Sequence, residues 1–163
     1  MTESTETSGL QVSFVPRSPT GPDEAREANP FAHFLGFRRT DTPYVIQRIS
    51  EGLSFSAYSR LLGEMALSQQ VLGDVVRIPA STLARRQREG QLTPAESDRL
   101  ARIAKVFSDA VDLFEGDKAA ARKWLSSPSK ALGGETPLKY SKSELGAREV
   151  EKLIGRLEHG VFT

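Results

Sequence analysis

The chain of 163 residues contains no cysteine and only two histidines, His33 and His159, which lie far apart in the sequence. The lack of cysteine excludes disulfides and thiolate chemistry and is typical of a reducing compartment. Two distant histidines do not indicate a metal site. No apolar run approaches the roughly 18 residues that a membrane-spanning helix requires, and the opening stretch MTESTETSGL lacks the charged and apolar regions of a signal peptide. These absences predict a soluble, cytoplasmic protein that holds no metal and no cofactor.

Patterns that carry catalysis are also missing. The sequence has no glycine-rich phosphate loop and no cluster of carboxylates in an apolar setting, and the stretch LGGETP is too short to be a nucleotide loop. With 22 Lys and Arg against 21 Asp and Glu, the net charge is +1, so only a local patch can select a charged partner. The sequence therefore predicts a binding protein rather than an enzyme.

Residues 1–40 differ in composition from the rest of the chain. Prolines stand among Ser, Thr, Glu and Gly, and no apolar period of 3.6 or 2 residues is sustained, which predicts a flexible arm. Because proteolysis starts in such arms, this one is a candidate degradation signal. One apolar stretch, NPFAHFLGFRR, has the i, i+3, i+4 spacing of one or two helical turns. It packs either on the core of the folded domain or on a partner that orders it.

From residue 41 onward the pattern is helical throughout, with no convincing strand and no internal repeat. The fold class is therefore all-α. We expect a helix-turn-helix-like domain over residues 41–116 and a smaller helical domain over residues 117–163. A helix of about twenty residues, about 30 Å long, ends the first domain and is long enough to join the two halves.

Several helix starts can be read from capping residues. Thr42 is predicted as an N-cap, because Pro43 follows it at the first helical position. Thr93 and Glu96 have the spacing of a capping box at the start of the long helix, and Ser141 has the same spacing to a later glutamate. These signals predict where three of the helices begin.

The stretch LSQQVLGDVVRIPASTLARRQREG has the pattern of a helix-turn-helix, with two short helices joined at Pro79 and Ala80. Ser and Thr at the start of the second helix can bond to phosphates or base edges, and its arginines can bind guanine through two hydrogen bonds. The other interpretation is a solvated basic face near the end of a helix, where the helix dipole favours cations. DNA binding implies a homodimer, because such proteins ordinarily read two half-sites. The predicted DNA-binding residues are Ser81, Thr82, Arg85, Arg86 and Arg88.

Three stretches carry a resemblance to a known family: IPASTLARRQREGQLTPAESDRLARIAKVFSDAVDLF, AARKWLSSPSKALGGETPLKY and GAREVEKLIGRLEHGVF. Together they resemble the Xre/MbcA/ParS group of bacterial antitoxins, over roughly residues 45–163. These proteins have a helix-turn-helix-like N-terminal domain and a C-terminal toxin-binding domain. The stretch LKYSKSELGAREV departs from the usual family pattern, which puts in doubt which toxin fits.

The resemblance implies an antitoxin of a type II toxin-antitoxin system. The partner that it implies is a RES-domain toxin, in several cases one that degrades NAD, which the antitoxin binds directly and blocks at its active site. It also implies autorepression of the operon through operator DNA. By this resemblance, the family's DNA-reading helix corresponds to the stretch that contains Ser81, Thr82, Arg85, Arg86 and Arg88. The alternative is a stand-alone helix-turn-helix regulator whose C-terminal module only associates with itself.

The same resemblance indicates a toxin-binding surface in the second domain. Trp124 belongs to this module but also suits the core of a small domain, where a tryptophan at a helix end usually packs. The final residues place a Val-Phe pair at the end of a polar stretch, which suits insertion into a cleft of the toxin as well as packing onto the preceding helix. The predicted toxin-binding residues are Trp124, Leu138, Leu157, His159, Gly160, Val161, Phe162 and Thr163.

Overall fold

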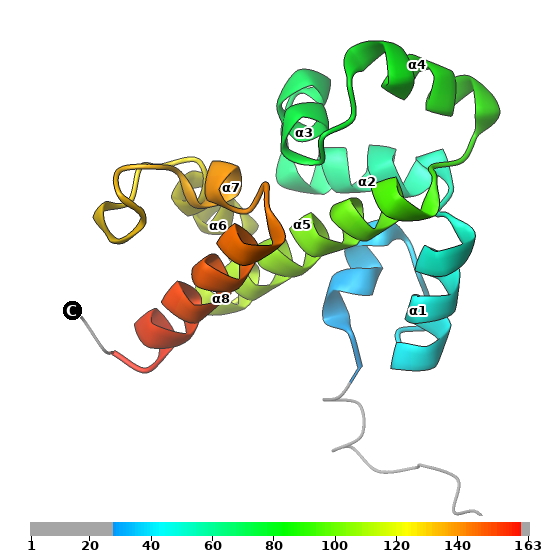
Figure 1. The fold of residues 1–163 in the computed structure, drawn as a ribbon. Helices are drawn as coiled ribbons and strands as arrows, with labels where there is room; N and C mark the ends of the chain where they lie inside the picture. Colours follow the sequence, from blue (N-terminus) through cyan, green and yellow to red (C-terminus); the bar gives the residue numbers. More distant parts are fainter. Residues whose placement is uncertain (1–27, 161–163) are drawn as a thin grey trace, which may run out of the picture.

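The computed structural model describes residues 28–160, and the described part is all-α, as predicted. Its only β-type pairing is an isolated bridge between Ser54 and Gln91. Figure 1 shows two groups of helices on either side of one long helix. In chain order, the elements are η2 (Pro30–Leu35), α1 (Thr42–Glu51), α2 (Phe55–Met65), α3 (Gln69–Val75), α4 (Ala80–Glu89), α5 (Pro94–Leu113), α6 (Lys118–Leu125), η3 (Lys130–Leu132), α7 (Pro137–Tyr140) and α8 (Glu144–Glu158).

The long helix α5 is the spine of the molecule. Its 20 residues confirm the predicted length, and Thr93 and Glu96 form the predicted capping box at its start. It packs against η2, α1 and α2, which precede it in the chain, and against α6 and α8, which follow it. Phe107, near its middle, is fully buried and meets the ring of Phe34 edge to face at 4.9 Å. A single hydrophobic core therefore runs through both halves.

The structure corrects the predicted limit of the N-terminal arm. Residues 28–40 are folded against the body, because Ala32 and Leu35 are buried and Phe34 packs on α5. Asn29 fixes the segment to the start of α1 by donating to the carbonyl of Thr40 at 3.0 Å. The apolar stretch thus packs on the chain's own core, and residues 1–27 lie outside the described part.

Two predicted helix starts are wrong by one or two residues. The N-cap of α1 is Asp41, whose carboxylate accepts from the amide of Tyr44, so Thr42 is already the first helical residue. The N-cap of α8 is Ser143, which accepts from the amide of Gly146. Ser141 is instead fully buried and donates to the carbonyl of Pro137 at 2.8 Å. In both cases neighbouring residues have capping side chains, and packing decides which of them caps.

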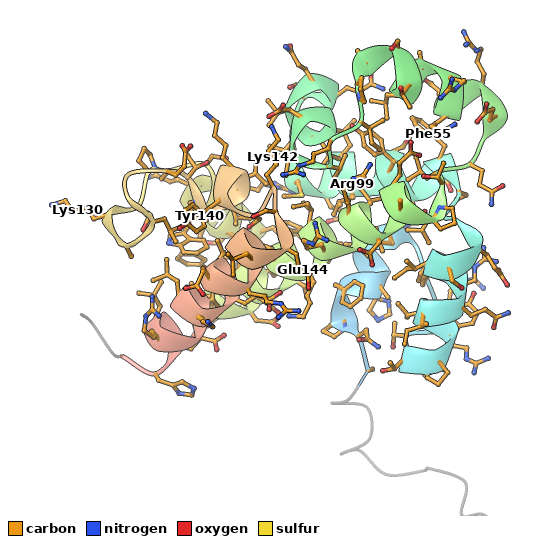
Figure 2. The ribbon with its side chains drawn as sticks, in the orientation of Figure 1. Phe55, Arg99, Lys130, Tyr140, Lys142 and Glu144 are labelled. Atoms are coloured by element: carbon orange, nitrogen blue, oxygen red, sulfur yellow. The ribbon has the colours of Figure 1, made fainter. Side chains whose placement is uncertain are left out.

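Polar contacts join the second half to the helix-turn-helix half. Lys118 of α6 lies 2.7 Å from a carboxylate oxygen of Glu64, and Arg122 donates to the carbonyl of the same residue at 2.8 Å. Lys142 lies 3.0 Å from Asp74 of α3, and Figure 2 shows it next to that helix. In the described part, no helix is both long and apolar enough to cross a membrane.

Candidate functional site

The helix-turn-helix is formed by α3 and α4, with residues 76–79 as the turn. Arg77 takes a left-handed conformation with φ of 56°, and the amide of Ile78 donates to the carbonyl of Gly73 at 2.9 Å. A side chain at Gly73 would place its Cβ 3.2 Å from the carbonyl oxygen of Ile78, so glycine permits this close approach. Ala80 is the first residue of α4 rather than part of the turn. Arg99 of α5 fixes the turn by donating to the carbonyl of Val76 at 2.7 Å.

Helix α4 has an outer face and an anchored face. Leu83 is 3% exposed and points into the core, whereas Ser81, Arg85 and Arg88 are exposed. Their i, i+4, i+7 spacing places these three side chains on one stripe of the helix. Thr82, one position on, is half-buried. The structure therefore brings three of the five predicted DNA-binding residues together on an accessible surface.

Arg86 lies on the anchored face of α4. Its Nε donates to the two carboxylate oxygens of Glu96 at 3.1 and 2.8 Å, and one terminal nitrogen donates to the same carboxylate at 3.0 Å. A second terminal nitrogen lies 3.1 Å from Glu89. The Glu96 carboxylate also accepts from the amide of Thr93 at 2.9 Å, so the capping box of α5 is the anchor for α4. The guanidinium of Arg86 is thus committed inside the protein.

This anchor shifts the ionisation of Glu96. Burial acts to raise the pKa of Glu96, but the hydrogen bonds from Arg86 and from the Thr93 amide outweigh burial and lower it below 4.5. The hydrogen bonds from Arg86 to Glu96, and then to Glu89, raise the pKa of Arg86. The pair is therefore ionised across the neutral range and holds α4 at a fixed angle to α5.

A hollow of about 690 Å³ lies between α3 and α4, beside the exposed stripe. Gln69, Gln70 and Gln87 line it together with Ala84, and the backbone of Gly73 forms part of its floor. Glutamine amides donate and accept hydrogen bonds in the pattern that adenine presents in the major groove. The hollow between the two helices thus offers amide groups beside the cationic stripe of α4.

The predicted toxin-binding residues divide into buried and exposed sets. Leu138 is 4% exposed, and Trp124 and Leu157 are partly buried and pack against the core, with the Trp124 ring 6.5 Å from that of Phe114. His159, the C-cap of α8, is exposed, as is Gly160, which has φ of 67°. The predicted residues Val161, Phe162 and Thr163 lie outside the described residues. Figure 1 shows that α4 and the C-terminal end of α8 lie at opposite ends of the molecule.

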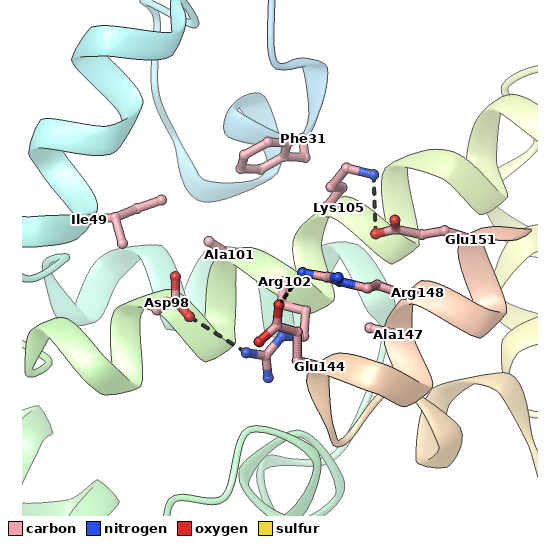
Figure 3. A pocket seen from close by; sticks show the side chains of 10 residues that line it. All are labelled: Phe31, Ile49, Asp98, Ala101, Arg102, Lys105, Glu144, Ala147, Arg148 and Glu151. Atoms are coloured by element: carbon pink, nitrogen blue, oxygen red, sulfur yellow. Dashed lines mark hydrogen bonds and ion pairs between the residues drawn. The ribbon is translucent and has the colours of Figure 1, made fainter.

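A second hollow, of about 540 Å³, lies where η2 and α1 face α8 across α5 (Figure 3). Its charged side chains are paired with one another: Asp98 with Arg102 at 3.5 Å, and Lys105 with both Asp109 and Glu151 at 3.1 Å. Burial raises the pKa of Asp109, which Lys105 partly offsets. Ion pairs of this kind indicate a structural contact at the protein surface rather than a site for acid-base catalysis.

Among residues 28–160, no group of three or more His, Asp or Glu side chains is placed to hold a metal ion.

Comparison with known proteins decides the family. The antitoxin Xre-like helix-turn-helix domain model matches residues 45–105, and the antitoxin Xre/MbcA/ParS C-terminal toxin-binding domain model matches residues 109–160. An Antitoxin Xre of Photorhabdus laumondii is 33% identical over 146 residues, which cover 87% of this chain and 97% of that protein. This chain belongs to the Xre antitoxin family.

Other members of the family align over different shares of their length. An Antitoxin Xre of Yersinia enterocolitica is 52% identical over 87 residues, which cover 53% of this chain and 59% of that protein. A Sphingobium protein named Prs ADP-ribosylating antitoxin is 26% identical over 142 residues, which cover 82% of this chain and 89% of that protein. The Xre-type similarity therefore includes both halves of the fold.

Sequence reasoning missed three residues of this Xre-family chain that the structure singles out, and one role of a fourth. Arg99, which fixes the turn, has the pattern of an ordinary charged helix position in the sequence. Glu96 was predicted in the capping box but not as the anchor of α4. Tyr140 and Leu145 are large apolar side chains that are 36% and 72% exposed in the toxin-binding domain, and Figure 2 shows Tyr140 on α7. The helix-turn-helix half also exposes two such residues, Ile46 and Val71, so exposure makes Tyr140 and Leu145 candidates for an interface without assigning one.

Proposed function

We propose that this Xre-family protein binds operator DNA through the exposed stripe of α4 and represses its own operon. Ser81, Arg85 and Arg88 carry the proposal, because they share one accessible face of a helix whose partner α3 can cross the backbone. Arg85 approaches Glu89 only to 3.9 Å, and Arg88 has no ion-pair partner among residues 28–160. Arg86 is left out of the proposed contact surface, because its guanidinium holds α4 on α5.

The second part of the proposal is neutralisation of a toxin by the C-terminal domain. Trp124, Leu138 and Leu157 support that domain from its core, so direct contact falls to exposed groups. Tyr140 and Leu145 supply apolar surface, and residues 159–163 supply a C-terminal segment that enters the active-site cleft of the toxin. The name of the Sphingobium relative supports ADP-ribosyl chemistry on the toxin's side, which uses NAD as donor. We therefore propose a RES-domain toxin that consumes NAD as the partner.

A homodimer completes the proposal. A single α4 reads one half-site, and a second copy related by a two-fold axis reads the other. In this proposal the protein acts in the cytoplasm, because both partners, operator and toxin, are inside the cell. It acts by binding them and not by catalysis.

The experiment separates the two functions. In Arg85→Ala/Arg88→Ala, we expect operator affinity to fall by about 1–3 kcal/mol per base-contacting arginine, while growth is still rescued when the toxin is co-expressed. A matched control, Arg148→Ala, removes an exposed arginine of α8 that pairs only within its own helix. Unchanged operator binding in the double variant would refute the α4 surface.

The C-terminal segment is tested by deleting residues 159–163 and following growth beside a pull-down of the toxin. Retained binding with lost rescue supports a segment that enters the active site. Equal rescue refutes that role and leaves inhibition to the body of the domain. A chain that neither binds nor neutralises a toxin would instead be a stand-alone regulator.

A further inference from the structure

A basic hollow of about 580 Å³ lies away from α4, where the turn after η2 and the start of α1 face the start of α2. Four arginines line it, together with two serines, and no acidic side chain is among its lining residues. These residues are Arg38, Arg39, Arg48, Arg60, Ser54 and Ser56. In a chain of net charge +1, this is a concentrated positive site.

Two of these arginines have no internal counter-charge. Arg39 pairs with Asp41, and a terminal nitrogen of Arg48 lies 3.4 Å from Glu51. Arg38 and Arg60 are exposed and make no ion pair within residues 28–160. Guanidinium groups that line one hollow repel each other, and an anion between them removes the repulsion.

Arg48 provides an independent sign of a missing acceptor. Its Nε is inaccessible to solvent and makes no hydrogen bond, and it is the only buried side-chain nitrogen or oxygen within residues 28–160 in that condition. Buried donors without a partner are rare in folded proteins. Because this nitrogen is closed to solvent, an anion in the hollow first meets the terminal nitrogens of Arg48, whose side chain is 42% exposed, and reaches the Nε only when the side chain shifts toward the hollow.

The serines add neutral donors at the end of a helix. Ser54 is the N-cap of α2, but its hydroxyl accepts no hydrogen bond from the first turn of that helix and instead meets the hydroxyl of Ser56. The 11 residues of α2 direct their positive dipole end toward this corner. One of the two hydroxyls donates to the other, so the pair has one O–H that is free to donate to an external oxygen.

Gly36 lets Arg60 reach the hollow. Its φ is 89°, and an added Cβ would lie 3.2 Å from Cδ of Arg60, which packs across the turn. On the opposite wall, the Arg39 guanidinium stacks over the Tyr44 ring at 5.1 Å. Backbone and aromatic contacts thus hold two of the arginines in place before any ligand arrives.

We propose that this hollow binds a phosphate group, with Arg38, Arg48 and Arg60 as charged donors and the Ser54–Ser56 pair as the hydroxyl donor. Arginine suits this role because its planar fork matches the oxygens of phosphate. The phosphate belongs either to a nucleic-acid backbone or to a free nucleotide, and the two sources share the same chemistry.

The first measurement uses the full chain and inorganic phosphate at constant ionic strength, followed by NMR. We expect saturable shifts at the side-chain Nε–H of Arg48 and at the amide of Ser56. Arg38→Gln/Arg60→Gln should weaken this binding by about tenfold or more. The matched control Arg148→Gln/Arg156→Gln removes the same charge from exposed positions of α8 and should leave it unchanged. Shifts that do not saturate, or that fall equally in both double variants, would show general screening and overturn the proposal.

Two further titrations, with a DNA duplex and with AMP, identify the molecule that supplies the phosphate. If the source is DNA, a short duplex shifts the same resonances, and Arg38→Gln/Arg60→Gln lowers the salt slope of DNA binding by about 1–2. If the source is a free nucleotide, AMP shifts them and DNA does not. The titration with inorganic phosphate contains neither DNA nor toxin, and the hollow is separate from α4 and from α6–α8, so its outcome is independent of the proposed function.

Discussion

The two halves of the molecule are attached to α5 by different kinds of interaction. The toxin-binding half packs on α5 through buried apolar side chains of α8, such as Val150 and Ile154, which are 0% and 2% exposed. The helix-turn-helix half adds directional bonds to its apolar core, from Arg86 to Glu96 and from Arg99 to Val76. Apolar burial is non-directional, whereas charge-assisted hydrogen bonds fix orientation. The angle of α4 therefore depends on a few side chains, whereas the position of α8 depends mainly on buried area, to which α5 adds one partly exposed ion pair, Lys105 with Glu151.

The same contrast separates two arginines within α4. Arg86 and Arg88 are two positions apart, so they point to different sides of the helix. Arg86 is held inside by Glu96, whereas Arg88 is exposed. Of these two arginines, Arg86 thus orients α4 on α5, and Arg88 is available to bind DNA.

The largest expected effect comes from the apolar attachment of α8. Ile154→Ala removes buried side-chain volume and should lower the free energy of unfolding by about 2–5 kcal/mol. Leu145→Ala, a matched truncation at a 72% exposed position of the same helix, should change it by about 0.5 kcal/mol or less. Urea unfolding measures both variants. Equal effects would mean that burial is not what holds α8 on α5.

A smaller loss is expected when the directional anchor is broken. Glu96→Gln removes the charge that binds Arg86 and should lower the free energy of unfolding by about 1–3 kcal/mol. Operator affinity should fall as well, because α4 is no longer held at its angle. Asp98→Asn changes an exposed carboxylate on the same helix and is the control. If Glu96→Gln weakened stability without affecting operator binding, the anchor would not set the orientation of α4.

The anchor also predicts a pH dependence. The pKa of Glu96 is lowered in the folded state, so its contribution is fully present above the ordinary value of 4.5 and is lost as the pH falls through the lower, folded value. The stability difference between the wild type and Glu96→Gln should therefore be constant near neutral pH and shrink below about pH 4.5. The pKa of Asp109 is raised, so its contribution to the free energy of unfolding changes with pH in the opposite direction. This contribution is the same in the wild type and in Glu96→Gln, so it cancels in the difference between them. Urea unfolding of both proteins across this pH range measures the difference. A difference that stays constant below pH 4.5 would mean that the Glu96 carboxylate does not stabilise the fold through its charge.

The sequence predicted periodic features better than it predicted the partners of individual polar side chains. The all-α class, the 20-residue α5 and its capping box follow from apolar spacing and from short-range capping rules. The sequence placed residues 28–40 in the arm and left open whether their apolar stretch packs on the core, because the decisive contact, Phe34 on Phe107, joins residues far apart in the chain. The anchoring role of Arg86 was missed for the same reason, because Glu96 lies ten positions away on another helix. Long-range pairing has no local periodic signal.

The smallest effect is expected where the two halves touch at the surface. Lys142 and Asp74 lie 3.0 Å apart, but their side chains are 39% and 64% exposed, so solvent screens the attraction. A double-mutant cycle with Lys142→Met and Asp74→Asn should give a coupling energy of about 0–1 kcal/mol that decreases as salt is added. If the coupling were much larger and independent of salt, this surface pair would fix the two halves as directionally as the hydrogen bond from Arg122 to the Glu64 carbonyl. Toxin binding near α7 would then bear directly on the position of α3, and the contrast between the two attachments would no longer hold.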